Sequence, residues 1–104
     1  MEGAAIYQIT TKKGFRASAS RAYLHPIKHR SNLEISLKSQ VTRVIFEGKK
    51  ATGVEFIKNG ELHSVKAQNE IILCGGAINS PQLLQQSGIG ASALLKNFDI
   101  PIIH

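Results

Sequence analysis

An apolar run followed at once by two glycines lies in the last third of the 104-residue chain. Ile71–Cys74 has no polar position, which is typical of a strand buried on both faces of a sheet. Gly75-Gly76 lets main chain approach a ligand, because glycine has no Cβ. Beyond it we expect a helix with Ser80 as N-cap, Pro81 in the first turn and Gly88 at the end. A free helix N-terminus favours phosphate, so this strand, turn and helix form either a ligand site or a plain tight turn.

The middle of the chain predicts an antiparallel meander. Leu33–Lys38 alternates apolar and polar residues with a period of two, as a half-buried strand does. Val41–Phe46 is rich in β-branched residues, and Val54–Phe56 alternates again. Asn59-Gly60 predicts a type I′ hairpin turn, from which Leu62–Ala67 returns as a further strand.

The two ends of the chain are less regular. We expect a short strand over Tyr7–Thr11, a turn at Lys13-Gly14, and a helix over Ala17–Leu24 that Pro26 stops. Ser92 is expected to cap a second helix near the other end. The final residues end on an apolar pattern, which suggests a truncated chain. We divide it into an irregular segment, 1–31, and a more regular part, 32–104.

The chain is basic, with thirteen Lys+Arg against seven Asp+Glu and a formal net charge of +6. Six of the basic residues fall within the first thirty positions: Lys12, Lys13, Arg16, Arg21, Lys28 and Arg30. This leaves open a stand-alone basic module that binds nucleic acid or an acidic partner, or an ordinary solvated surface. A single cysteine, no apolar run of membrane-spanning length and no signal sequence favour a reducing, cytoplasmic setting.

Other motifs carry less chemistry. Gly88–Ala93 matches the G-x-G-x-x-A fingerprint but follows a helix rather than a strand, so we interpret its glycines as a helix stop. His25 and His29 are four residues apart, but Pro26 between them disfavours one helix face, and no metal site is expected. Ser80 has no base partner nearby, so capping is its expected role.

Taken together, several segments resemble the glucose–methanol–choline (GMC) family of flavin oxidoreductases. Gly76–Leu84 followed by Ser87–Gly90 is similar to the second signature of that family. The resemblance extends upstream through most of the chain, over Tyr7-Gln8, Thr10, Gly14, Arg16, Ser18, Ala22–Leu24, Asn32-Leu33, Val41–Val44, Phe46–Gly48 and Ala51–Glu55. The most similar branch is that of alcohol dehydrogenases, including those that act on choline.

The resemblance implies a fold and a cofactor. It implies an α/β fold, or α+β in the isolated piece: part of an FAD-binding sheet, 32–104, with a β-meander and short helices. It implies that 1–31 borders the substrate domain. The residues that it places on the adenine side of FAD are Val41, Cys74, Gly75, Gly76, Asn79 and Ser80. Cys74 stands where serine or alanine is commoner, and Gln85-Gln86 makes the helix face more polar.

The resemblance also implies how activity is divided. The parent enzyme would take a proton from an alcohol with a basic histidine while hydride passes to the flavin. The family's pyrophosphate loop and its C-terminal histidine pair do not lie in these 104 residues. We therefore expect an internal fragment with no catalytic residue of its own, whose partners are FAD, a small alcohol and the missing segments of the same protein. A membrane-associated parent stays open.

Overall fold

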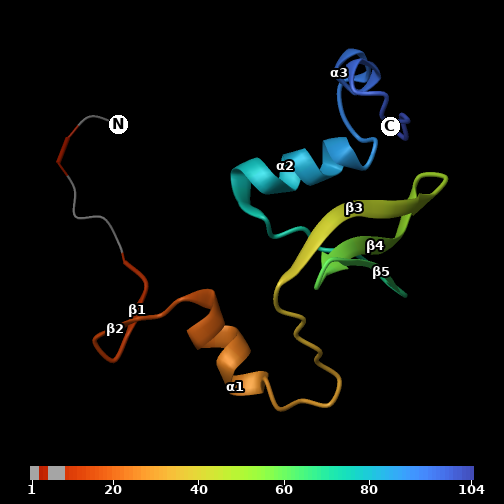
Figure 1. Ribbon diagram of the computed structural model, residues 1–104. Helices are drawn as coiled ribbons and strands as arrows, with labels where there is room; N and C mark the ends of the chain where they lie inside the picture. The colour runs from red at the N-terminus through yellow and green to blue at the C-terminus, as the bar shows by residue number, and fades with distance from the viewer. Residues whose placement is uncertain (1–2, 5–8) are drawn as a thin grey trace. The chain divides into compact units, whose positions relative to one another are not determined.

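The structure is a computed structural model that describes residues 3–4 and 9–104 (Figure 1). These residues form two compact units, Met1–Ser36 and Leu37–His104. The first unit begins with a small antiparallel hairpin of β1 (Thr11–Lys12) and β2 (Phe15–Arg16). The expected turn at Lys13-Gly14 joins them, and both residues have positive φ, 51° and 76°. Of the predicted strand over Tyr7–Thr11, positions 7 and 8 lie outside the described residues.

The helix of the first unit differs from the prediction at its end. It runs as a π-helical turn, η1 (Ser20–Leu24), into a short α-helix, α1 (His25–Ile27). Ala19 is its N-cap, and just before it the Ser18 Oγ accepts the backbone N–H of Arg21 at 3.3 Å. Pro26 therefore lies within the helix and does not stop it, contrary to our expectation. The wide π turn, in which the His25 N–H bonds to the Ser20 carbonyl, gives room for a residue that lacks an N–H.

The second unit is built on the predicted meander. β3 (Ser39–Glu47), β4 (Lys50–Lys58) and β5 (Glu61–Lys66) form one antiparallel sheet in that order. The Asn59-Gly60 turn is confirmed, since both residues have the positive φ that a type I′ turn requires, 54° and 83°. The prediction of a strand over Leu33–Lys38 is wrong. That segment has no ladder, and among the described residues no strand lies beside it to supply hydrogen bonds.

Two bulges shape the sheet. The register between β3 and β4 shifts between Val41 and Arg43, and again between Ile45 and Phe46. Thr42 is the extra residue at the first shift and Thr52, on β4, at the second. Gly53 follows the second bulge, and a Cβ there would lie 2.6 Å from the carbonyl oxygen of Val65. Only glycine therefore lets β4 and β5 approach this closely.

The helix after the meander starts earlier than predicted. α2 (Gly76–Gln86) has Gly75 as its N-cap, so Ser80 is not the cap and Pro81 lies inside the helix. Ser80 still supports the start, because its Oγ accepts the backbone N–H of Gly75 at 2.9 Å. The predicted end at Gly88 is confirmed: Gly88 has φ 90° and forms a Schellman motif, in which the Ile89 N–H bonds to the Leu84 carbonyl at 2.9 Å.

The last segment folds back onto this helix end. α3 (Ser92–Asn97) has Ala91 as its N-cap, so Ser92 is its first residue rather than the cap we expected. The Ile103 N–H donates to the Gly88 carbonyl at 2.8 Å, and the Gly90 N–H to the His104 carbonyl at 3.2 Å. A Cβ on Gly88 would overlap the carbonyl oxygen of Pro101. Gly88 thus both ends α2 and lets the chain terminus pack against it.

The predicted buried strand Ile71–Cys74 is not formed. The segment belongs to no sheet, Ile72 is 72% exposed, and Cys74 is exposed as well. The physical reason is the same as for Leu33–Lys38: a strand needs a partner, and in the described part of the chain none lies alongside. An apolar run shows that a segment favours burial. It does not show that a sheet is present to bury it.

The core of the second unit is small. Among the described residues Val44 (4% exposed) and Leu95 (1% exposed) are the buried hydrophobic side chains. Within residues 3–4 and 9–104, no helix is both long and apolar enough to cross a membrane. The structure confirms a mixed α/β chain with an antiparallel meander and short helices.

Candidate functional site

A groove of about 710 Å³ opens in the second unit beside the glycine turn. The beginning of β3, Val54 of β4, the run after the meander and one side of α2 line it. Its lining residues are Ser39, Gln40, Val41, Val54, Ile71, Ile72, Leu73, Cys74, Gly75, Asn79, Ser80, Gln82, Leu83 and Gln86. Segments more than thirty residues apart in sequence therefore share one concave surface.

Five of the six residues expected on the adenine side of a flavin meet in this groove. Val41 comes from β3, Cys74 and Gly75 from the turn, and Asn79 and Ser80 from the first half of α2. The sixth, Gly76, does not line the groove. It opens α2 with φ 83°, a backbone conformation that a side chain would strain. The structure thus brings together residues that sequence position alone leaves apart.

The turn is held close to α2. A Cβ on Gly75 would lie 3.1 Å from the Asn79 Cβ and 3.3 Å from the Ser80 Oγ. Together with the hydrogen bond from the Gly75 N–H to Ser80, this keeps main chain at the groove wall where a side chain would otherwise stand. The turn can therefore offer backbone groups to a flat ligand.

Ser87 fixes α2 against the sheet. Its Oγ donates to the Leu83 carbonyl at 2.6 Å and accepts the Val44 N–H at 2.8 Å. Ser87 is itself buried, and its hydrogen bond with the Val44 N–H is buried as well. Figure 1 shows α2 lying over β3 in this arrangement. The two walls of the groove are thereby held at a set separation.

The groove is polar but uncharged. Ser39, Gln40, Asn79, Ser80, Gln82 and Gln86 supply hydroxyl and amide groups, and no Lys, Arg, Asp or Glu lines it. Sequence reasoning noted the polar character of Gln86 but missed Gln82, although residues i and i+4 share a helix face. It also missed Ser39 and Gln40, which only the pairing of β3 brings to the turn.

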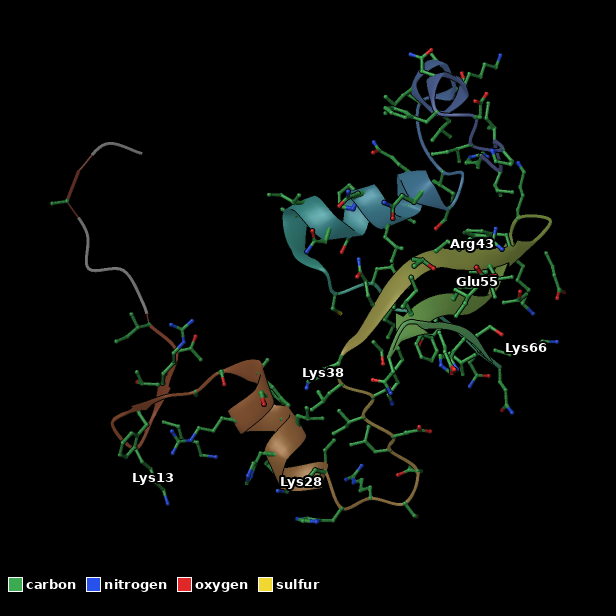
Figure 2. The ribbon with its side chains drawn as sticks, viewed as in Figure 1. Lys13, Lys28, Lys38, Arg43, Glu55 and Lys66 are labelled. Atoms are coloured by element: carbon green, nitrogen blue, oxygen red, sulfur yellow. The ribbon has the colours of Figure 1, made fainter. Side chains whose placement is uncertain are left out.

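An ion pair stands on the sheet next to the groove. Arg43 on β3 and Glu55 on β4 are direct cross-strand partners (Figure 2). The Arg43 Nε donates to Glu55 Oε2 at 2.6 Å, and the Arg43 Nη2 to Oε1 at 2.7 Å. These hydrogen bonds hold the pKa of Glu55 below its ordinary value and raise the pKa of Arg43.

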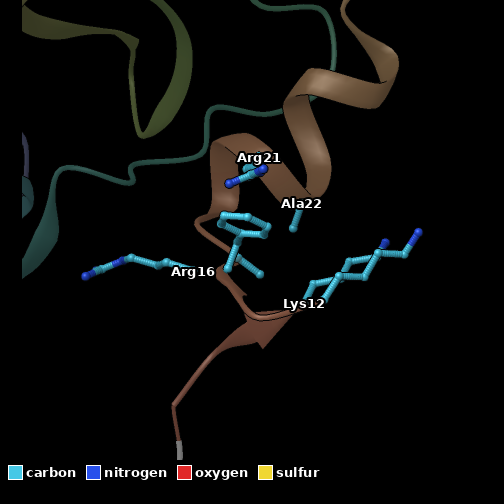
Figure 3. A pocket seen from close by; sticks show the side chains of 7 residues that line it. Lys12, Arg16, Arg21 and Ala22 are labelled. Carbon is cyan, nitrogen blue, oxygen red and sulfur yellow. The ribbon is translucent and has the colours of Figure 1, made fainter.

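A second, smaller pocket in the first unit bears on the basic-module alternative. It measures about 280 Å³ and surrounds Phe15, over whose ring the Arg21 guanidinium lies at 5.0 Å. Both Lys12 and Arg16 line the pocket, and Figure 3 shows their side chains extending in opposite directions. The charges do not converge on one anion there. In the part of the chain described, no group of three His, Cys, Asp or Glu could hold a metal.

Comparison with known proteins decides the family. The GMC oxidoreductase N-terminal family model matches residues 1–101. The chain belongs to the GMC oxidoreductase family. No comparison supports the nucleic-acid alternative.

Two relatives show how much of a protein the chain represents. It is 55% identical over 104 residues to an oxygen-dependent choline dehydrogenase of Staphylococcus saprophyticus, covering 99% of this chain and 18% of that protein. It is 50% identical over 102 residues to the mitochondrial choline dehydrogenase of Homo sapiens, covering 98% of this chain and 17% of that protein. The chain therefore spans less than a fifth of the length of these relatives.

Two solved structures share the fold. An FAD-dependent oxidoreductase from Chaetomium thermophilum superposes with a TM-score of 0.79 at 34% identity, over 84% of this chain and 15% of that one. Pyridoxine 4-oxidase from Mesorbium loti superposes with a TM-score of 0.80 at 33% identity, over 89% of this chain and 18% of that one. The expected fold class is thus confirmed by two solved oxidoreductase structures.

The groove fits part of a flavin nucleotide. Its size is in the range of small-molecule sites, and its lining combines apolar side chains with amides and hydroxyls. At Gly75 a Cβ would crowd Asn79 and Ser80, so main chain forms the wall here. A flat, uncharged base and its sugar match this lining, whereas a pyrophosphate would find no cationic side chain in it.

Proposed function

We propose that this chain is part of the FAD-binding domain of an enzyme that oxidises CH–OH groups, and that its groove holds the adenine side of FAD. One observation carries the proposal: five of the six residues predicted for that side line a single uncharged groove. Choline or a related alcohol is the proposed substrate class, because the relatives named above are choline dehydrogenases. Oxidation of the alcohol lies with other parts of the protein.

The residues have separate roles in this proposal. The main chain at Val41 and at Gly75 faces the adenine, one from each wall of the groove. Asn79 and Ser80 support the turn from α2, and Gly76 lets the chain turn into the helix. Cys74 packs as a small residue at the wall. FAD, when bound, supplies the hydride acceptor; this chain contributes binding and orientation only.

The proposal is tested on the full-length protein by narrowing the groove. Replacing Cys74 with leucine adds two heavy atoms to the wall in an already apolar segment. We expect the dissociation constant for FAD to rise about tenfold or more, as loss of fit of roughly 1.4 kcal/mol would give. Lys49→Leu, in the β3–β4 turn, is the matched control and should leave FAD binding unchanged.

Competition with AMP separates binding from folding. AMP carries the adenine half of FAD, so it should displace FAD from the wild-type protein and do so more weakly from Cys74→Leu. Riboflavin 5′-phosphate lacks that half and should compete equally with both proteins. A full-length protein with no flavin absorbance and no affinity for FAD or AMP would contradict the proposal, as would equal AMP affinity in Cys74→Leu and wild type.

A further inference from the structure

The first bulge of the sheet controls which face of β3 each residue presents. Val41 pairs with Phe56, and Arg43 pairs with Glu55, the next residue along β4. Neighbouring residues of a strand point to opposite faces, and cross-strand partners share a face. Val41 and Arg43 are two residues apart, so they would share a face in a regular strand; the extra residue Thr42 places them on opposite faces.

The bulge therefore places Val41 on the same face of the sheet as Val54, which also lines the groove. Val41 lines the groove and is 39% exposed, whereas neither Arg43 nor Glu55 lines it. A one-residue slip of β3 against β4 would move every side chain of that stretch to the other face. The register between β3 and β4 at Val41 therefore affects the wall of the groove as well as the pairing of the sheet.

Two contacts fix that register. The Thr42 hydroxyl donates to the main-chain carbonyl of Glu55 at 3.3 Å. The side chain of the same Glu55 receives both hydrogen bonds from Arg43. A bidentate pair is geometrically specific, because the guanidinium and the carboxylate must lie in matching planes. Glu55 is therefore held through its backbone by Thr42 and through its side chain by Arg43 (Figure 2).

From this geometry we infer that Thr42, Arg43 and Glu55 are positioning residues, which hold the β3 bulge in the register that presents Val41 to the adenine side of the cofactor. The inference rests on the function proposed above. It assigns a ligand-related role to residues that touch no part of the groove. Their contribution lies in the affinity for the adenine half, since the chemistry of alcohol oxidation takes place elsewhere.

The second bulge provides a control within the same sheet. Thr52 is also an extra residue at a register shift, and its hydroxyl donates to the Ile45 carbonyl at 3.5 Å. Thr52 does not line the groove, nor do its neighbours at that shift, Ile45 and Phe46. Thr42→Val and Thr52→Val therefore remove the same hydroxyl from two bulges, only one of which adjoins the proposed site.

The experiment measures AMP and FAD dissociation constants for full-length wild type, Thr42→Val, Thr52→Val, Glu55→Gln and the reversed pair Arg43→Glu/Glu55→Arg. We expect about fivefold weaker binding of both ligands in Thr42→Val and Glu55→Gln, in line with the modest strength of one exposed pair. Thr52→Val should match wild type. The reversed pair should return to within about twofold of wild type, because it restores the clamp.

The turnover number at saturating FAD should not change in any variant, which a general loss of structure would not allow. Equal affinities in Thr42→Val, Glu55→Gln and Thr52→Val, with wild-type binding intact, would overturn this inference and leave the proposed function standing. Failure of the reversed pair to recover affinity would also overturn it. A wild-type protein that binds neither ligand would overturn the proposed function itself, and the inference with it.

Discussion

The meander and the segment directly after it have similar strand-forming composition but different outcomes. β3, β4 and β5 pair with one another, and every strand finds its partner within thirty residues. Ile71–Cys74 is more apolar than any of these strands, yet it pairs with nothing in the described chain and leaves Ile72 exposed. Local pairing therefore decides which apolar segment becomes a strand here. The groove lies where the paired and the unpaired regions meet.

This difference bears on how the site is built. One wall belongs to the β3–β4–β5 sheet, whose register is fixed by turns and bulges. The other wall is Ile71–Cys74, which would need a partner strand to be buried. We expect those neighbours to come from the remaining four-fifths of a protein as long as the relatives. The comparison predicts that the two regions respond differently to isolation and to substitution.

Isolation of the 104-residue chain should have the largest effect. Large apolar side chains are exposed on the run, on α2 and on β5, including Ile72, Ile78 and Leu62. At about 25 cal/mol per Å² of apolar surface left in water, this forfeits several kcal/mol, comparable to the stability of a small domain. We expect the chain alone to aggregate or to melt without a sharp transition, as followed by circular dichroism and light scattering. A monomeric chain with a cooperative melt would contradict this.

Hydrogen exchange locates the same effect within the molecule. In the full-length protein the amides of Ile71–Cys74 should be protected to a similar degree as those of β4. In the isolated chain they should exchange like an unfolded segment, while β4 keeps part of its protection. Equal protection of Ile71–Cys74 in the full-length protein and in the isolated chain would contradict the difference between this segment and the meander.

Gly88→Ala should be the most harmful single change in the second unit. It combines a φ of 90° with an overlap of the new Cβ on Pro101, and we expect a loss of about 3 kcal/mol in the free energy of unfolding of the full-length protein. Gly60→Ala is the matched control, since Gly60 has a similar φ of 83° but open space around it. It should cost about 1 kcal/mol. Denaturant unfolding measures both, and equal losses would show that the close approach of the chain terminus is unimportant.

Ser87→Ala tests the tie between α2 and the meander. It leaves the buried Val44 N–H without its acceptor, so we expect a loss of about 2 kcal/mol in the free energy of unfolding. Ser64→Ala, on exposed β5, should change it by less than about 0.5 kcal/mol. Both values come from denaturant titration of the full-length protein. A loss in Ser87→Ala no greater than in Ser64→Ala would show that α2 is held by other contacts.

Only some of the features on which these predictions depend could be predicted from the sequence. The turn at Asn59-Gly60, the three meander strands and the stop at Gly88 were predictable, because each depends on local backbone chemistry. The unpaired state of Ile71–Cys74 was not, because an apolar pattern does not reveal whether a partner strand is present.

The start of α2 and the groove were missed for related reasons. Ser80 and Pro81 together looked like a helix start, but the Ser80 hydroxyl reaches back to Gly75 from inside the helix. Gly75 stood out from the sequence pattern, whereas Val41, Cys74, Asn79 and Ser80 were placed at the cofactor only by the family resemblance. The polar lining from Ser39 and Gln82 became visible only when β3 and α2 were placed together.

The smallest expected effect is a pH dependence of the paired region. Arg43 keeps the pKa of Glu55 below its ordinary value of 4.5, so the ion pair stabilises the folded sheet above that pH. This stabilisation is lost as the pH falls through the lowered value in the folded state, where Glu55 takes up a proton. The difference in melting temperature between wild type and Glu55→Gln should therefore narrow below pH 4.5. A constant difference at all pH values would contradict this, and Glu47→Gln serves as a control of equal charge change.

A crystal structure of the full-length protein with FAD bound tests the central claim most directly. The account predicts the adenine ring in the groove between β3 and the Gly75 turn, with main chain of Val41 and of Gly75 against it and the pyrophosphate held by residues outside this chain. An adenine ring bound elsewhere, with a protein side chain or strand filling this groove in the holoenzyme, would contradict it.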